Sequence, residues 1–148
     1  MFYRVIRVMT MTLSIILCHA CTKSAPEDII KKNINAIQTA IEDKNNSGVR
    51  QHISRQFNAS GAGGIRLTDA NLRQYLAGIF IRYNNIRLLI SNTEVRIEEF
   101  DPYRAESRTN VTVTSAEGLI PDTARIYQVR GSWVQEDGEW KLIQISWQ

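Results

Sequence analysis

The chain has 148 residues, of which 43% are hydrophobic and 22% are charged, and it carries a formal net charge of +3 and two cysteines. This length suits one domain, which can bury about two-thirds of the surface of its unfolded chain. Two basic residues, Arg4 and Arg7, belong to the amino-terminal segment described next, and without them the charge falls to +1. We therefore exclude nucleic acid as a partner.

The amino terminus has the three parts of a secretory signal peptide. Arg4 and Arg7 occur without an acidic residue, residues 8–17 form a short apolar run, and Cys18-His19-Ala20-Cys21 follows. The apolar run is too short to span a bilayer, for which about 20 apolar residues are needed. Residues 1–20 are therefore predicted to direct export.

Leu17 and Ala20, ahead of Cys21, resemble the lipobox of bacterial lipoproteins, although Cys18 stands where an aliphatic residue is usual. The resemblance implies cleavage after Ala20 and a lipid on Cys21. Because Thr22 rather than Asp follows, it also implies the periplasmic face of the outer membrane. Cleavage at a nearby site, or no cleavage, is the alternative.

This processing would define the rest of the chain. With Cys18 removed and Cys21 lipidated, no thiol is left for a disulfide, a metal or a nucleophile. Residues 21–25 would be the lipidated cysteine and a short tether, whose reach beyond the cysteine is about 14 Å. The domain of residues 26–148 should therefore lie close to the membrane.

Three helices are predicted between residues 26 and 83. Ser24-Ala25-Pro26-Glu27 is typical of a capping box with proline in the first turn, and Asn45-Asn46-Ser47-Gly48 ends the first helix. A short second helix is predicted over Val49–Phe57, and Thr68 caps a third. Apolar residues recur at helical spacing: Ile30, Ile34, Ile37 and Ile41 in the first helix, Val49, Ile53 and Phe57 in the second, and Leu72, Tyr75, Leu76, Ile79, Phe80 and Tyr83 in the third.

Asn58–Gly64, which reads NASGAGG, separates the second and third helices. A glycine-rich loop can bind a phosphate, but the lysine and hydroxyl that complete such a site are missing, because Ile65-Arg66-Leu67 follows. We interpret the segment as a plain turn.

Two long strands are expected next. In Asn85–Glu99 the apolar residues change from even to odd positions, which predicts a bulge or break near residues 91–94. After a turn at Asp101-Pro102, Tyr103–Ser115 alternates between polar and apolar residues. Residues 117–122 contain the glycine and proline of a loop.

The carboxyl-terminal hairpin is the strongest signal. Arg125–Gln135 and Glu139–Trp147 flank Asp137-Gly138, the dipeptide of a two-residue type I′ turn. The last strand is apolar on both faces, so one face needs a cover such as a partner subunit or a bound molecule; the alternative is a central strand covered by its own loops. The expected pairs are Trp133–Leu142, Gln135–Trp140 and Val129–Ser146 on one face, and Val134–Lys141, Ser132–Ile143, Arg130–Ile145 and Gln128–Trp147 on the other.

Helices that lead into a bent sheet, together with the hairpin Trp133-x-x-x-Asp137-Gly138-x-Trp140-Lys141-Leu142, look like the nuclear transport factor 2-like fold. The resemblance covers about residues 26–148. It implies an α+β cone with three amino-terminal helices on a bent antiparallel sheet, a ligand cavity, and often a dimer through the sheet. The expected cavity residues are Tyr75, Tyr83, Tyr103, Tyr127 and Trp133, and the expected interface residues are Ile143, Ile145 and Trp147.

The acid and base groups that enzymes of this superfold use are not matched. The first helix has no tyrosine, residues 56–67 contain no Asp, Glu or His, and His52 is the only histidine after the signal peptide. Asp101 and Asp122 lie beside prolines in predicted loops. We therefore assign no catalytic residue, no metal site and no cofactor.

Three roles are compatible with these features. The first is a lipid-anchored envelope protein that binds a small apolar ligand or a protein partner without catalysis. The second is an enzyme of the polyketide cyclase or isomerase kind, with Glu94 or Asp101 as its acid and Arg130 or one of the tyrosines in support. The third is a structural dimer at the membrane. The fold alone does not choose between them.

Overall fold

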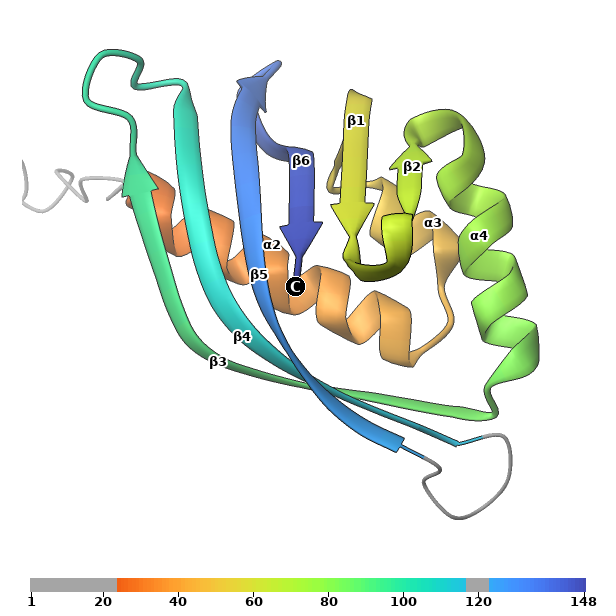
Figure 1. Ribbon diagram of the computed structural model, residues 1–148. Helices are drawn as coiled ribbons and strands as arrows, with labels where there is room; N and C mark the ends of the chain where they lie inside the picture. The colour runs from red at the N-terminus through yellow and green to blue at the C-terminus, as the bar shows by residue number, and fades with distance from the viewer. Residues whose placement is uncertain (1–23, 117–122) are drawn as a thin grey trace, which may run out of the picture.

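The computed structural model describes residues 24–116 and 123–148 (Figure 1). The predicted signal peptide, Cys21 and the loop over 117–122 lie outside the described residues. No helix in the described ranges is long and apolar enough to cross a membrane.

Helix α2 (Pro26–Glu42) lies across one face of the sheet (Figure 1). Its start is favoured by Pro26, whose missing N–H has no partner to lose in the first turn, and by Glu27, whose charge suits the amino-terminal end of the helix dipole. The helix is held to the sheet by its apolar stripe, in which Ile30 is fully buried. The predicted capping box is wrong, because Ala25 is the N-cap residue and no side chain caps this helix.

The predicted second helix over Val49–Phe57 is also wrong. Helix α3 (Asn46–Arg50) is one short turn, and Ile53–Gly61 forms strand β1. Apolar residues four positions apart fit a strand as well as a helix, because four is an even number of strand positions. Phe57 and Ala59 alternate with exposed neighbours and are buried on one face of β1.

The glycine-rich segment divides between two elements. Residues 58–61 continue β1, whereas Ala62–Gly64 form a 3₁₀ turn (η2) in which Gly63 and Gly64 have positive φ angles. The turn leads into strand β2 (Arg66–Thr68), which pairs back on β1. The predicted turn is thus correct for the last three residues only.

Helix α4 (Asp69–Arg82) begins where the sequence predicts it. Thr68 is the N-cap residue, and its backbone N–H donates to Asn71 Oδ1 at 2.7 Å, which completes a reciprocal capping box. Leu72 and Leu76 are the buried residues of this helix.

Six strands form one bent sheet in the order β2-β1-β6-β5-β4-β3. The four strands that follow α4 are β3 (Asn85–Ile97), β4 (Arg104–Ala116), β5 (Thr123–Glu136) and β6 (Glu139–Trp147). Neighbouring strands are antiparallel except β1 and β6, which are parallel. The α+β class is confirmed, but the sheet is mixed, and two of its strands precede α4.

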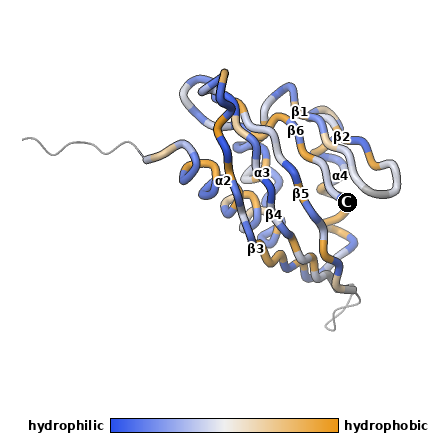
Figure 2. The backbone as a smooth tube through the Cα atoms, turned by 60° about the vertical axis from the view of Figure 1, so that its left-hand side comes forward, coloured by the Kyte–Doolittle hydropathy of each residue, from blue (hydrophilic) through white to orange (hydrophobic). Residues whose placement is uncertain are grey.

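The predicted bulge in β3 is confirmed. The register between β3 and β4 shifts between Ser91 and Glu94, and Asn92 in this interval has a φ of 53°. The long strands β3, β4 and β5 bend around α2 (Figure 1). Along the strands the tube in Figure 2 changes repeatedly between hydrophilic and hydrophobic colours, as expected for a sheet with one buried face.

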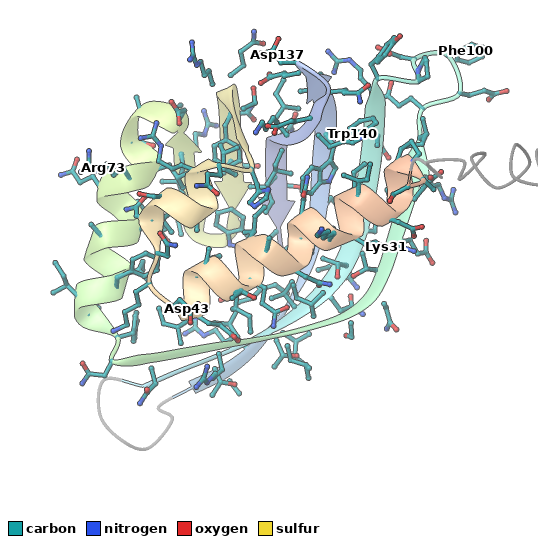
Figure 3. All side chains as sticks on the ribbon, turned by 180° about the vertical axis from the view of Figure 1, so that it is seen from behind. Lys31, Asp43, Arg73, Phe100, Asp137 and Trp140 are labelled. Carbon is teal, nitrogen blue, oxygen red and sulfur yellow. The ribbon has the colours of Figure 1, made fainter. Side chains whose placement is uncertain are left out.

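The predicted turn of the β5–β6 hairpin is confirmed, because Asp137 and Gly138 have φ angles of 51° and 83°. Next to the turn, the predicted pairs Trp133–Leu142 and Gln135–Trp140 are also present. Trp140 is buried, and Figure 3 shows its side chain beside α2. The side-chain amide of Asn33 in α2 donates to the Trp140 carbonyl oxygen at 2.9 Å, which fixes the helix to the last strand.

Farther from the turn, the predicted register is wrong. It shifts between Ser132 and Trp133, so that Ile143 is an extra residue on β6, and Ile145 and Trp147 then pair with Gly131 and Val129. A slip of one residue moves every later side chain to the opposite face of a sheet.

Candidate functional site

A cavity of about 540 Å³ lies between the helices and the concave face of the sheet. This volume is within the range of small-molecule sites in proteins. Apolar side chains form most of its wall. The lining residues are Ile34, Ile37, Gln38, Ile41, Ile65, Tyr75, Ile79, Tyr83, Ile86, Leu88, Ile90, Ser107, Thr109, Val111, Val113, Arg125, Tyr127, Val129, Gly131, Trp133, Leu142, Ile145 and Trp147.

The bulge at Ile143 completes one side of this wall. Because of it, Ile145 and Trp147 line the cavity together with Trp133 and Leu142. The predicted register places Ile145 and Trp147 on the opposite face, where they were expected to meet a partner subunit. The structure instead turns Ile145 and Trp147 toward the cavity, and a dimer through the sheet stays a prediction.

Gly61 provides the space for Trp147. The two residues are neighbours across β1 and β6, and a Cβ atom at Gly61 would overlap the indole ring. The φ angle of Gly61 is −143°, which any residue can adopt, so the requirement for glycine here is the close approach of the ring.

The polar side chains deep in the cavity are bonded within the wall. The indole N–H of Trp133, which is 2% exposed, donates to Ser107 Oγ at 2.9 Å. Thr109 Oγ1 donates to the Ser91 carbonyl oxygen at 3.1 Å and is 2.8 Å from Thr93 Oγ1. These groups stabilise the sheet and have little bonding capacity left for a ligand.

Helix α2 is fixed to the edge strand β3 by a pair of hydrogen bonds. The Gln38 side-chain amide donates to the Leu88 carbonyl oxygen at 2.7 Å, and the Leu88 N–H donates to Glu42 Oε1 at 2.7 Å. Leu88 lies opposite Val113, and these bonds satisfy its outward backbone groups. This pair of hydrogen bonds, called the Leu88 clamp below, covers the sheet edge where β3 bounds the cavity.

Three tyrosines meet on the cavity wall. Tyr75 and Tyr83 come from α4 and its carboxyl-terminal end, and Tyr127 comes from β5. Burial raises the pKa of the Tyr75 phenol, and the neighbouring Tyr127 and Tyr83 raise it further. The Tyr75 phenol therefore stays protonated at neutral pH and can donate a hydrogen bond to a ligand. Tyr75 is 37% exposed, which places this cluster at the cavity mouth.

Arg125 lies at the same mouth. A second hollow of about 500 Å³ adjoins the cavity, and the two share Ile65, Arg125, Tyr127 and Trp147 as a common wall. Arg125 is exposed and is the one charged residue among the described lining residues of either hollow. The sequence analysis missed it. Arg125 is at an odd position on β5, like Tyr127 and Trp133, and residues at alternate positions of a strand share a face, so this pattern could have indicated that Arg125 faces the cavity.

Four of the five predicted cavity residues lie on the cavity wall: Tyr75, Tyr83, Tyr127 and Trp133. Tyr103 does not. It is 62% exposed beside the turn before β4, where its backbone N–H donates to Asp101 Oδ1 at 3.0 Å. Tyr103 stands at the end of an alternating run, so its position in the run matches that of the inward-facing residues, but it lies beyond the region that the helices cover.

The acids considered for an enzyme lie elsewhere. Glu94 is an exposed residue at the β3 bulge, Asp101 pairs with Arg104 at 3.4 Å in the β3–β4 turn, and Arg130 is exposed on β5. His52 is also outside the cavity wall, and its pKa is lowered by burial and by the charge of Lys141. The described lining residues include no Asp, Glu or His. Within residues 24–116 and 123–148, no group of three or more His, Cys, Asp or Glu is placed to hold a metal.

The sequence matches no family model and no curated protein. Several solved structures are similar. An NTF2-like protein of unknown function from Pseudomonas putida has a TM-score of 0.72 at 12% identity, covering 84% of this chain and 87% of the other. An NTF2-like protein from Cytophaga hutchinsonii has a TM-score of 0.71 at 15% identity, covering 84% and 98%.

Another similar structure is a protein from Novosphingobium aromaticivorans that is named as a candidate scytalone dehydratase. Its TM-score is 0.69 at 14% identity, and the match covers 82% of this chain and 81% of that chain. A protein of unknown function with a cystatin-like fold from Nostoc punctiforme has the same TM-score at 16% identity, covering 84% and 91%. The chain therefore has the nuclear transport factor 2-like, or cystatin-like, fold that its sequence resembles.

Proposed function

We propose that the protein is a lipid-anchored component of the bacterial cell envelope that binds a small apolar ligand in its cavity without transforming it. The observation that carries the proposal is the cavity of about 540 Å³, in which apolar walls lead to a mouth of hydrogen-bond donors. An apolar pocket with a few convergent polar groups is the usual form of a ligand site. The lipid on Cys21 and the short tether would hold this mouth near the membrane.

The cavity wall favours binding over catalysis. Chemistry of the cyclase or isomerase kind needs a group that accepts a proton. The described lining residues offer no carboxylate or imidazole, and the raised pKa of Tyr75 makes its phenolate a poor candidate at neutral pH. An enzyme remains the alternative because one similar structure is named as a candidate scytalone dehydratase.

A matched pair of substitutions on β5 tests the binding site. Val129 lines the cavity, whereas Gln128 is exposed on the same strand and lines neither the cavity nor the adjoining hollow. Val129→Trp should fill the cavity and weaken uptake of the neutral fluorescent probe N-phenyl-1-naphthylamine by about tenfold or more, since bulk at this position displaces the ligand. Gln128→Trp should bind the probe as the parent does. Unchanged binding by Val129→Trp would place the site elsewhere.

The anchor is tested separately in the full chain. Cys21→Ser should abolish incorporation of radiolabelled palmitate and release the protein from the membrane fraction. Cys18→Ser is the control, because that residue is predicted to leave with the signal peptide. Equal labelling of the parent and the Cys21→Ser variant would refute lipidation at this cysteine.

A further inference from the structure

The polar groups of the cavity divide into two sets. Away from the mouth, the side chains of Ser107, Thr109 and Gln38 form hydrogen bonds within the protein at 2.7–3.1 Å. At the mouth, the described residues provide no hydrogen-bond partner for the Tyr127 hydroxyl or the Arg125 guanidinium. Donors with free capacity are therefore concentrated at one end of an otherwise apolar cavity.

The positive charge of Arg125 makes the mouth of the cavity selective for an anionic group. Arg125 lies in the wall that separates the cavity from the adjoining hollow of about 500 Å³, and no acid lines either space in the described part of the chain. An anionic group at this wall would meet a guanidinium and phenolic O–H donors, and no described lining residue would repel it. Such charge-assisted hydrogen bonds are stronger than neutral ones, and guanidinium suits carboxylate geometry.

Because a phenolic O–H donates hydrogen bonds, the tyrosines on the cavity wall favour the same ligand end. A neutral hydroxyl or carbonyl would use the phenols but would leave the guanidinium without a counterion. A cation would be repelled. The two hollows together also suit a molecule with an apolar body and a distinct head.

We propose that the ligand is an amphiphilic carboxylic acid, with its apolar body in the cavity and its carboxylate on Arg125 and Tyr127 at the mouth. This inference rests on the proposed binding function and adds the chemical class of the ligand. It makes Arg125 the residue that distinguishes an acid from a neutral analogue of the same shape.

The tryptophans provide a built-in probe. Trp133 and Trp147 line the cavity, and bromine quenches tryptophan fluorescence only at short range. The full chain carrying Cys21→Ser, which takes no lipid, is titrated below the critical micelle concentration with 9,10-dibromostearic acid and with the corresponding dibromostearyl alcohol. The acid should quench with an affinity about tenfold or more above that of the alcohol.

Variants separate the head group from the apolar body. Arg125→Gln should weaken binding of the acid by about tenfold or more and leave binding of the alcohol unchanged. Arg125→Lys should retain part of the preference for the acid. Arg130→Gln is the matched control, because Arg130 is exposed on the same strand and does not line the cavity.

The outcomes distinguish the two levels of the proposal. If neither bromolipid quenches, the binding function fails together with this inference. If both quench equally, or if Arg125→Gln weakens the alcohol as much as the acid, the cavity binds apolar molecules and the carboxylate assignment is overturned.

Discussion

Replacing Gly61 with alanine should displace Trp147 from the cavity wall. A Cβ atom at position 61 would overlap the indole ring, so the ring or the strand must move. Overpacking of this kind costs about 1–3 kcal/mol. Without the overlap, the same substitution at an extended residue would be neutral or stabilising by about 0.5 kcal/mol, because alanine has less freedom in the unfolded chain.

Denaturant unfolding of the full Cys21→Ser chain measures this cost, and Gly78→Ala provides the control. Gly78 lies inside helix α4 with open space around it, so alanine there should stabilise by about 0.5–1 kcal/mol. A double-mutant cycle with Trp147→Ala identifies the cause, since the cost of Gly61→Ala should vanish once the ring is gone. An equal cost in both backgrounds would refute the inward position of Trp147.

Three further predictions concern the wall and its supports. In a cycle of Trp133→Phe and Ser107→Ala, the hydrogen bond of 2.9 Å should give a coupling of about 0.5–1.5 kcal/mol in unfolding experiments, and additive effects would contradict it. Gln38→Ala should cost about 1–2 kcal/mol and speed amide exchange near Leu88, whose carbonyl loses its partner; unchanged stability and exchange would argue against the Leu88 clamp. The pKa of His52 is lowered in the folded chain from its usual 6.5, so the free energy of unfolding should be highest above pH 6.5 and should fall as the pH drops below it. His52→Gln should flatten this decline. A variant with the parent's pH profile would show that His52 is not responsible.

The bulge in β3 could be predicted from the sequence, whereas the bulge in β6 could not. In β3 the apolar residues themselves change parity on either side of Ser91, so the pattern records the defect. In β6 the residues around Ile143 are apolar at both parities, and an uninterrupted strand fits them equally well. The second bulge decides whether Ile145 and Trp147 face the cavity, and a strand without it would place both residues on the opposite face.

Strand β1 shows the limit of periodicity more generally. The spacing of Val49, Ile53 and Phe57 fits both a helix and a strand. What selects the strand is its parallel partner β6, which is about 85 residues away in the sequence, for example in the pair of Ala59 with Ile145. No local pattern encodes such a contact. The Thr68 cap and the Asp137-Gly138 turn, by contrast, depend on local sequence, and both were predicted correctly.

Native mass spectrometry of the protein isolated from the membranes of its own cells would show directly whether the cavity holds a natural ligand. We expect a population that carries, besides the lipid on Cys21, a noncovalently bound molecule that leaves on mild activation and is an organic acid with an apolar body. Val129→Trp should lose this molecule while it keeps the lipid. A parent protein that carries no ligand, and that takes up neither bromolipid when these are supplied, would contradict the proposed binding function.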